Sequence, residues 1–427
     1  MNVSNEYKGF DSTDTGYRPP DAGLAAGQSK NVQAINSLWG IFDQGTGNRE
    51  WDTTLTDWFS NVIPDPDNTK VFDPRATYDY GADRYILCAV GKDNNTDEGF
   101  WLLSASDTSD PYDSWSNTRI DLSSSDYWVD FPGLGVDEHG IMLTGNIYES
   151  GKGFQYASIV VVDKSELYNQ DSYTYWRYTE VQNPDGSQAA TIQPADGLTS
   201  ASKQYLVNSQ SGGGDTLSLY KITNPATSNQ YLNSYSVSVN SYSAPPEAEQ
   251  PDTTTSLRIS DARLRSATVY ANGSVWATHH VGYDWGDSDT EAIVAWYEVD
   301  VSSESVVQQG GFGLDDNYLF FPSIAVNPST DDMMITYNRT NESSIYPGVK
   351  VAGRESSDDS GSIKGYTNVK SGESAYDPSS SDPERWGDYT AMSLDASDQS
   401  KFWLYGEYGL DSSNQDEYGM WTARANW

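Results

Sequence analysis

Three aromatic side chains lie in polar segments where they could bind sugars. Tyr283, Trp285 and Tyr346 have Asp and Ser neighbours and lie outside the apolar runs of the chain. An aromatic face stacks on the C–H surface of a sugar ring, and nearby carboxylates and hydroxyls pair with its hydroxyl groups. These residues therefore favour carbohydrate binding. Most of the 14 Trp are expected to fill the core instead, among them Trp101, Trp276, Trp296 and Trp403.

A second set of candidates consists of charged side chains at the beginning of short apolar runs. The arginines are Arg75, Arg263 and Arg385, and the carboxylates are Asp73, Asp130, Asp196, Asp261 and Asp388. If these runs are the inner strands of a ring, the side chains can converge near its axis. They then either pair with one another and with exposed backbone groups, or contact a ligand. No nucleophile, base or carboxylate pair has a spacing that demands catalysis.

The turn at residues 93–99 offers oxygen ligands for a metal ion. Asp93, Asn95 and Asp97 alternate as in a calcium loop, but the Gly comes one place late and no Glu occupies the twelfth position. Such strings also arise by chance in a chain this acidic. We expect no cofactor, with calcium at this turn as the alternative. His279 and His280 are adjacent, so in a strand they face opposite sides and cannot form a zinc site together.

A repeat in the sequence predicts the strands that must position these residues. Seven short runs of small and apolar residues recur at intervals of 52 to 68 residues, and each has a polar residue, Pro or Gly at its beginning. Four strands with their turns need roughly 40 to 60 residues, the size of one propeller blade. The runs begin at Asp21, Asp73, Asp130, Gln193, Asp261, Phe321 and Trp386. The repeat predicts an all-β, seven-bladed β-propeller.

The ends of the chain are expected to complete this ring. Only about 40 residues follow the beginning of the last run, so its blade needs a strand from elsewhere. We predict that the N- and C-terminal segments share one blade. Residues 1–20 would be an N-terminal arm, with docking on a neighbouring molecule as one use, and residues 21–427 a single propeller domain. Six blades with an added N-terminal unit is the alternative.

Composition narrows the class of partner. Lys and Arg number 25 against 62 Asp and Glu, a net charge of −37. Nucleic acid binding requires basic patches, which are lacking here. Self-repulsion of this size is screened at molar salt, so a high-salt medium is expected. The single Cys, Cys88, lies in an apolar run and is expected to be buried.

Several motifs in order along the chain resemble a family of sialidase-like (BNR-type) β-propeller surface proteins. They lie at residues 19–27, 73–79, 106–115, 132–137 and 384–395, and the last, with Trp386, Gly387, Asp388 and Tyr389, is the most specific. The resemblance implies a propeller fold. It also invites a sialidase mechanism, with three arginines for the substrate carboxylate, a Tyr nucleophile and an Asp acid/base. Here Arg75, Arg263, Arg385, Asp73 and Asp388 would supply these groups, but the repeated Asp boxes of true sialidases are missing.

We therefore expect a non-enzymatic recognition module that binds a host surface glycan or glycoprotein. Its ligand-binding residues would be Asp130, Asp196, Tyr283, Trp285, Tyr346, Trp386 and Tyr389. A sialidase-like glycoside hydrolase and a purely structural decoration protein are the alternatives. The first residues lack a basic segment followed by an apolar one, so export without a Sec signal is expected. A spike, turret or receptor-binding protein of a tailed virus of haloarchaea fits this, with other virion proteins and further copies of the chain as partners and no membrane insertion.

Overall fold

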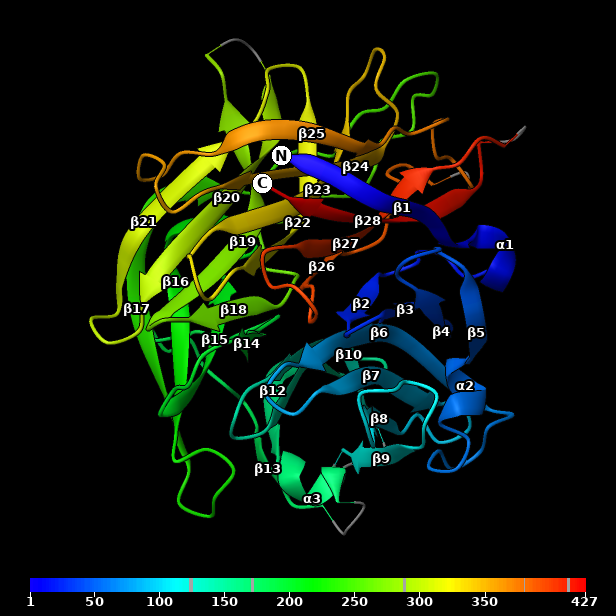
Figure 1. Ribbon diagram of the computed structural model, residues 1–427, viewed down its shortest axis with the longest axis vertical. Helices are drawn as coiled ribbons and strands as arrows, with labels where there is room; N and C mark the ends of the chain where they lie inside the picture. The colour runs from blue at the N-terminus through cyan, green and yellow to red at the C-terminus, as the bar shows by residue number, and fades with distance from the viewer. Residues whose placement is uncertain (123–125, 170–172, 287–288, 380, 413–414) are drawn as a thin grey trace.

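The structure of the chain is a computed structural model that describes residues 1–427 except 123–125, 170–172, 287–288, 380 and 413–414 (Figure 1). Within the described residues, regular structure consists of 28 strands and three helices of four or five residues. The helices are α1 (Ser12–Thr15), α2 (Leu55–Trp58) and α3 (Lys164–Tyr168). None of these helices is long and apolar enough to cross a membrane. The prediction of an all-β chain is confirmed.

The first three sheets are antiparallel and four-stranded, and each follows the order of the chain. The first contains β2 (Gly23–Ala26), β3 (Lys30–Ile35), β4 (Leu38–Asp43) and β5 (Arg49–Thr54). The second contains β6 (Thr69–Asp79), β7 (Arg84–Asp93), β8 (Gly99–Ser106) and β9 (Trp115–Asp121). The third contains β10 (Tyr127–Val136), β11 (Ile141–Glu149), β12 (Gly153–Val162) and β13 (Tyr175–Tyr178). The two middle strands of each sheet are rich in β-branched and aliphatic residues, as buried strands should be.

The next eight strands form one sheet made of two such units, which are joined by parallel pairing of β14 with β18. The first unit is β14 (Gln193–Gly197), β15 (Lys203–Ser209), β16 (Gly213–Thr223) and β17 (Tyr231–Ser243). The second is β18 (Thr268–Ala271), β19 (Ser274–Asp284), β20 (Thr290–Asp300) and β21 (Ser305–Phe312). A further four-stranded sheet follows, with β22 (Tyr318–Val326), β23 (Met333–Thr340), β24 (Gly348–Arg354) and β25 (Lys364–Lys370).

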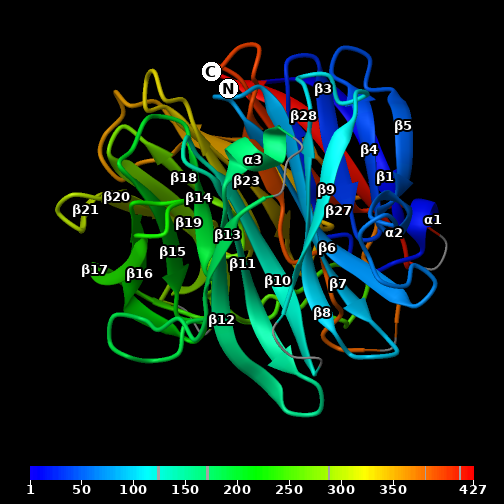
Figure 2. The same cartoon turned by 90° about the horizontal axis from the view of Figure 1, so that it is seen from below.

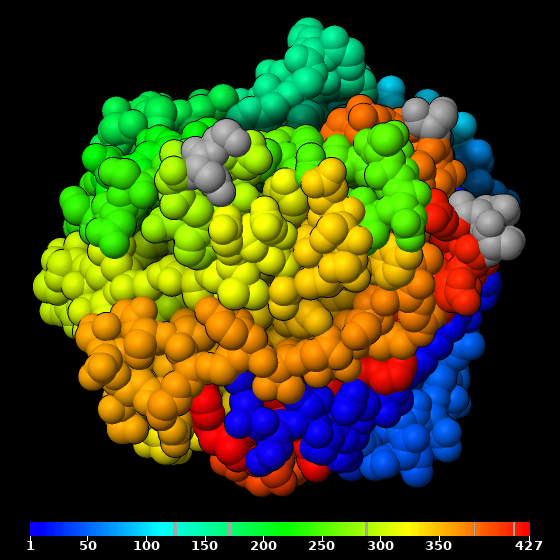
Figure 3. All heavy atoms as spheres, turned by 90° about the horizontal axis from the view of Figure 1, so that it is seen from above, coloured from blue at the N-terminus to red at the C-terminus, as the bar shows by residue number. Residues whose placement is uncertain are grey.

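The last sheet combines strands from both ends of the chain. It contains β26 (Ala391–Leu394), β27 (Phe402–Gly409) and β28 (Tyr418–Asn426), with β1 (Asn2–Asp11) at its outer edge. β1 runs antiparallel to β28, with Asn2 opposite Asn426 and Asp11 opposite Gly419. Residues 2–11 of the expected N-terminal arm are thus a strand of this sheet. In Figure 3, β1 (blue) lies on the surface beside the C-terminal strand (red) and β25 (orange).

The first strands of successive sheets lie side by side around a common centre (Figures 1 and 2). In chain order these strands are β2, β6, β10, β14, β18, β22 and β26; each contacts the next, and β26 contacts β2. Every sheet therefore directs its first strand inward and its fourth strand outward. Repeated four-stranded sheets in this arrangement are typical of a β-propeller.

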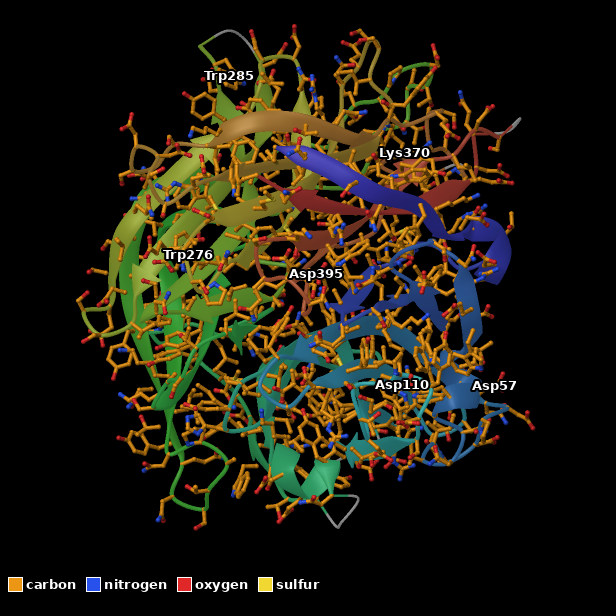
Figure 4. All side chains as sticks on the ribbon, viewed as in Figure 1. Asp57, Asp110, Trp276, Trp285, Lys370 and Asp395 are labelled. Carbon is orange, nitrogen blue, oxygen red and sulfur yellow. The ribbon has the colours of Figure 1, made fainter. Side chains whose placement is uncertain are left out.

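The core lies between neighbouring sheets, where large aromatic side chains fill the gaps. Trp101, Trp276, Trp296 and Trp403 are all fully buried, as the sequence predicted. Trp101 also bonds across sheets, because its Nε1 donates to the carbonyl oxygen of Thr144 at 2.9 Å. Cys88 is buried as well. Figure 4 shows Trp276 within its sheet.

A recurring backbone feature shapes the end of the ring at which the first strands begin, here called the mouth. Asp21, Asp73, Phe131 and Phe321 all have left-handed backbone, with φ between 48° and 54°. Three of them lie at register shifts between a first strand and the next one, at 72/75, 130/133 and 320/323. Such bulges turn the chain sharply and re-aim side chains. They therefore set the direction of the charged groups at the mouth.

The segment from residue 244 to 267 packs across part of this end. Ala248, Leu257 and Ile259 are fully buried within it. Gln250 exchanges two hydrogen bonds of 2.8 Å with the backbone of Tyr376. The Pro-containing stretch at residues 244–251 is thus anchored into the core, and the pockets at this end of the ring lie over the sheets that begin at β2, β6, β10 and β14.

Candidate functional site

A pocket of about 450 Å³ opens at the mouth and is called here the mouth pocket. Its carboxylates come from four sheets or the segments that precede them, and they are Asp21, Asp73, Asp130 and Asp388. Four cationic side chains also line it, namely Arg18, Lys70, Lys92 and Arg385. Its aromatic lining consists of Tyr17, Phe72, Trp128 and Phe131. Of the predicted residues, the structure thus brings together Asp73, Asp130, Arg385 and Asp388.

Short hydrogen bonds fix the positions of these carboxylates. Asn36, in the turn between β3 and β4, donates from Nδ2 to Asp21 Oδ2 at 2.5 Å. Its Oδ1 accepts from the backbone N–H of Asp73 at 2.7 Å. The backbone N–H of Asp388 donates to Asp21 Oδ1 at 2.7 Å. One amide and one peptide group therefore tie the acids of three sheets together.

The position of Asp388 is also fixed through the residue before it. The backbone N–H of Gly387 donates to Oε2 of the buried Glu407 at 2.8 Å. A Cβ at position 387 would approach this oxygen to 2.6 Å, so any larger residue would have to displace the Glu407 carboxyl group. Burial raises the pKa of Glu407 well above its usual value, which favours a neutral carboxyl group. The Gly387-Asp388 pair of the most specific sequence motif thus has a structural origin.

Burial shifts the acids at the mouth toward their neutral forms. It raises the pKa of Asp21 to about 7, with the charge of Asp388 adding to the effect. Burial, followed by the charges of Asp21 and Asp130, raises the pKa of Asp73 well above its usual value. The pKa of Asp130 is raised as well, again mainly by burial and then by Asp388. The carboxyl groups of Asp21 and Asp73 therefore carry less than their full negative charge near neutral pH.

The predicted arginines do not converge on one point. Arg75 lines the narrow channel inside the ring, and Arg385 lines the mouth pocket. Arg263 lines a further pocket between the sheets of β10 and β14. Arg385 is 55% exposed and reaches Asp388 at 3.2 Å. The three guanidinium groups therefore cannot hold a single ligand carboxylate, as the resemblance implied they would.

Arg75 and Arg263 are occupied by groups of the protein itself. Arg75 donates from Nε to the carbonyl oxygen of Pro132 at 2.9 Å and from Nη2 to that of Arg265 at 2.8 Å. Arg263 binds Asp261 through Nη2 at 2.7 Å. Burial alone would raise the pKa of Asp261, but Arg265 and Arg263 outweigh it and hold this pKa well below its usual range. In the structure these inner Asp and Arg residues pair with one another and with backbone groups, which is one of the two outcomes left open by the sequence.

Arg265 joins the acids of two segments. Its guanidinium group bonds to both Asp261 and Asp388. Arg265 was not among the residues singled out from the sequence. Its position two residues after Arg263, on the same side of an extended segment, is the signal that marks it.

Trp386 and Tyr389 are buried rather than available to a ligand. They are 1% and 3% exposed. Trp386 donates from Nε1 to Asn338 Oδ1 at 3.2 Å, and Tyr389 lies beneath the guanidinium group of Arg75. Their predicted role as ligand contacts needs correction, because these rings form part of the floor beneath the mouth.

Asp196 lies within the ring rather than at the mouth. It lines the narrow central channel and accepts hydrogen bonds from Thr77 Oγ1 at 2.9 Å and from the backbone N–H of Val136 at 3.0 Å. Burial raises its pKa to about 7. The channel encloses only about 60 Å³, enough for a few water molecules at most. Asp196 is thus separate from the other predicted acids.

The three loop aromatics lie outside the mouth pocket. Tyr283 and Trp285 are 46% and 39% exposed and meet edge to face at 4.8 Å, on the hairpin between β19 and β20. Figure 4 shows Trp285 at the periphery of the molecule. The hydroxyl of Tyr346 donates to Asp252. Neither the mouth pocket nor the pocket of Arg263 includes these three residues.

The oxygen-rich turn at residues 93–97 is occupied by internal bonds. Asp93 Oδ1 accepts from the backbone N–H groups of Asn95 at 2.7 Å and Thr96 at 3.3 Å. Asp97 pairs with Lys92 at 2.8 Å, and this hydrogen bond lowers its pKa. Among the described residues, the acidic group compact enough to share a metal ion is Glu291, Asp315 and Asp316, which lies elsewhere.

The aromatic walls of the mouth pocket were missed from the sequence. Phe72 and Trp128 are half-buried and contact each other, with ring centroids 6.5 Å apart. Lys92 lies over Trp128 at 5.2 Å. A signal was available, because Phe72 directly precedes Asp73, and Trp128 precedes Asp130 by two residues on the same face of β10.

Comparisons with known proteins give distant structural likeness only. No family model matches the chain, and no curated protein matches it by sequence. A mutant Trypanosoma rangeli sialidase with trans-sialidase activity is 10% identical, covering 82% of this chain and 53% of its own, with a TM-score of 0.42. The WD40 domain of SCAP from fission yeast is 10% identical, with coverages of 93% and 82% and a TM-score of 0.35. A native Bacillus subtilis arabinanase is 14% identical, with coverages of 67% and 96% and a TM-score of 0.31. Because these TM-scores are below 0.5, we draw no conclusion about function from them.

Proposed function

We propose that the chain is a non-enzymatic recognition module that binds a host surface glycan or glycoprotein at the mouth pocket. The observation that carries this proposal is the composition of that pocket. It places the rings of Phe72 and Trp128 in one lining with the carboxylates of Asp73 and Asp130. Aromatic faces take the C–H surfaces of a sugar, and carboxylates accept from its hydroxyls. The size of about 450 Å³ is within the range of small-molecule sites.

We also infer that the ring has seven blades. On this interpretation, five sheets are one blade each and the eight-stranded sheet is two. The pairing of β1 with β28 would then hold the first and last segments in one blade. A six-bladed ring with an added unit would leave one of the seven first strands outside the circle of contacts.

The hydrogen bonds that Arg75 and Arg263 already make favour binding over hydrolysis. Arg75 and Arg263 already bond to backbone carbonyls and to Asp261, so a substrate carboxylate would compete with buried bonds. Tyr389, the Tyr of the most specific motif, is buried under Arg75 and is out of reach of a sugar. A Tyr nucleophile at the mouth is therefore not proposed.

One observation favours a glycoside hydrolase as the second candidate. The pKa of Asp21 is raised to about 7, as a general acid for a leaving sugar requires. Asp21 Oδ1 and Oδ2 accept from Asp388 and Asn36, however, so both oxygens are in use. A protein that only decorates a particle is the third candidate, and it would need no mouth pocket.

The setting that we propose is a medium of high salt. A net charge of −37 is tolerated when the Debye length is a few ångströms, as at molar salt. We propose a position on the surface of a virion, as a spike or turret that meets the host, assembled with other virion proteins and further copies of the chain. No cofactor is needed for binding, and calcium at residues 93–97 remains a subsidiary proposal.

The proposal is tested by incubating the purified protein in molar KCl with glycoprotein from the surface of salt-loving cells. Complex formation and released sugar are both followed by mass. Stable complex without release supports recognition, whereas sugar release supports the hydrolase. Trp128→Ala should weaken complex formation by at least about tenfold. Tyr366→Ala, at a 48% exposed ring on the outer strand β25, should leave it intact. Absence of both signals contradicts recognition and leaves the decoration protein.

A further inference from the structure

A second pocket, called here the side pocket, lies next to the mouth pocket at the same end of the ring. It measures about 560 Å³. Asn146 and Tyr148 reach it from the end of β11, Phe154 from the beginning of β12, and Gln210 from the turn after β15. The end of β11 pairs with the beginning of β10, the strand that carries Trp128 and Asp130 into the mouth pocket. The two pockets therefore flank a single strand pair.

Residues opposite each other in this strand pair supply both pockets. Trp128 of β10 faces Tyr148 of β11, and Asp130 faces Asn146. The rings of Trp128 and Tyr148 are stacked, with centroids 4.9 Å apart and planes 23° from parallel. Directly opposed side chains lie on the same face of a sheet. The wall between the pockets is thus a shared aromatic surface rather than a barrier.

This surface continues on both sides as a row of four rings. Phe72 lies 6.5 Å from Trp128 at one end, and Phe154 lies 5.7 Å from Tyr148 at the other. All four side chains are half-buried, so each presents part of its ring to solvent. The row Phe72–Trp128–Tyr148–Phe154 runs from the mouth pocket into the side pocket.

Five of the thirteen residues that line the side pocket carry amide side chains, and several of these amides are already held in place. Asn146 donates from Nδ2 to Thr191 Oγ1 at 3.0 Å and accepts from the backbone N–H of Thr191 at 2.8 Å. Asn183 Oδ1 accepts from Asn208 Nδ2 at 3.1 Å and from the hydroxyl of Tyr220 at 2.9 Å. Fixed amides bind a ligand with little further loss of conformational entropy. An amide also offers both a donor and an acceptor, the pattern that sugar hydroxyls require.

The charge of the side pocket indicates what part of a ligand it takes. The charged residues in its lining are Asp261 and Arg263, and they bond to each other at 2.7 Å. An ionised group of a ligand would have to break this pair. A hydroxyl-rich, uncharged sugar unit would not.

We propose that the mouth pocket and the side pocket form one groove, which binds an extended oligosaccharide chain across the four-ring row. At least one uncharged sugar unit lies in the side pocket and another in the mouth pocket. This inference rests on the proposed function, because it specifies the ligand of the same site. It assigns binding roles to Tyr148 and Phe154, which had none.

The experiment is calorimetric titration in 2 M KCl of the full chain with paired probes. Each pair is a neutral monosaccharide and its linear hexamer: glucose with maltohexaose and with cellohexaose, xylose with xylohexaose, and N-acetylglucosamine with its β-1,4-linked hexamer. We expect a hexamer to bind at least about tenfold more tightly than its monosaccharide. Tyr148→Ala and Phe154→Ala should each weaken hexamer binding about tenfold, the equivalent of about 1.4 kcal/mol, and leave monosaccharide binding unchanged.

Controls separate the groove from general loss of structure. Tyr148→Phe keeps the ring and should keep hexamer affinity, and Tyr366→Ala, on the outer strand β25, should change nothing. Equal affinity for a monosaccharide and its hexamer, or full hexamer affinity in both Tyr148→Ala and Phe154→Ala, overturns the groove while leaving sugar recognition in place. Failure of every probe to bind overturns the groove for neutral chains, and the glycoprotein experiment then decides separately whether recognition itself survives.

Discussion

The guanidinium carbon of Arg75 lies 3.1 Å from the centre of the Tyr389 ring. The two residues come from opposite ends of the chain, on the first strand of one sheet and just before the first strand of another. Both lie in motifs that resemble a sialidase-like family, and their contact gives these motifs a structural reason. The pair supports the floor of the mouth instead of contacting a substrate.

Replacement of Arg75 should therefore destabilise the fold. Arg75→Ala removes two hydrogen bonds to backbone carbonyls and the contact with Tyr389, and leaves those carbonyls unpaired in a buried place. We expect a loss of about 3 kcal/mol in the free energy of unfolding, measured by guanidinium chloride titration. Arg385→Ala serves as the control, because that side chain is 55% exposed and should cost less than about 1 kcal/mol. Equal stability of the two variants would contradict a structural role for Arg75.

Trp128 should dominate sugar affinity. Its ring lies between Phe72 and Tyr148 and forms the wall common to the two pockets. Trp128→Ala is expected to weaken glycan binding by at least about tenfold, because ring stacking contributes about 1 kcal/mol or more. Affinity is measured by calorimetry in molar KCl, together with the melting temperature to verify folding. Trp285→Ala, at an exposed ring outside both pockets, should bind as the unmodified chain does.

Stability should rise as the pH falls from about 8 to about 5. Burial raises the pKa of Asp21 to about 7 in the folded chain, above the value of about 4 for an unfolded chain. The folded state therefore binds more protons than the unfolded state between these two values, so acidification stabilises it in this window. Asp196 acts in the same direction.

The Asp21→Asn variant isolates this contribution. Asn is tolerated at the left-handed φ of 52° and carries no charge, but its amide nitrogen cannot accept the bond that one Asp21 oxygen accepts now, a loss that is the same at every pH. The melting temperature of this variant relative to that of the unmodified chain should therefore be higher at pH 8 than at pH 5. A difference that is the same at both pH values would show that titration of Asp21 is not involved.

Removal of salt should unfold the chain or lower its melting temperature. The net charge of −37 repels itself once the Debye length grows to about 10 Å at 0.1 M salt. We expect the melting temperature, followed by circular dichroism, to increase steadily from 0.1 M to 3 M KCl. An unchanged melting temperature over this range would contradict adaptation to high salt.

The outer strand β1 should be essential because it also contacts the first sheet. The hydroxyl of Tyr7 accepts from Asn31 Nδ2 at 2.9 Å and from Gln33 Nε2 at 3.1 Å, both on β3. Tyr7→Phe keeps the ring but leaves these buried amides without that partner, which should cost about 1–2 kcal/mol in a guanidinium chloride titration. Deletion of residues 1–11 also removes the buried ring of Phe10, uncovers its neighbour Phe42, and should abolish cooperative unfolding. Unchanged stability after this deletion would mean that β1 is dispensable.

The sequence allowed the repeated sheets to be predicted, because period and strand length act locally. The run containing Cys88 became β7, the run containing Trp101 became β8, and both residues are buried as expected. The alternation of strand residues could not say which Trp faces a neighbouring sheet and which faces the mouth. Trp101 and Trp128 lie in similar runs, yet Trp101 is buried while Trp128 lines the mouth pocket, because their places relative to the next sheet differ.

The charged site was predictable in composition but not in pairing. Asp73, Asp130, Arg385 and Asp388 do share one pocket. The direction of Arg75 depends on the bulge at residues 72–75, and a bulge shifts the register by one residue without a clear mark in the sequence. Trp386 and Tyr389 were expected to bind ligand, but both are buried, so their motif serves packing instead.

The pairing of β1 with β28 also has a consequence for the order of events during protein synthesis. Ser4 and Arg424, hydrogen-bonded neighbours in this pairing, are 420 residues apart in the chain. The ribosome therefore releases β1 long before β28 has been synthesised. Until then the sheets made in between form an incomplete ring, and the sheet at each end of it has an uncovered edge. Such edges invite association with other nascent chains. A newly made molecule therefore remains exposed to such association until its last strands have been synthesised and have paired with β1.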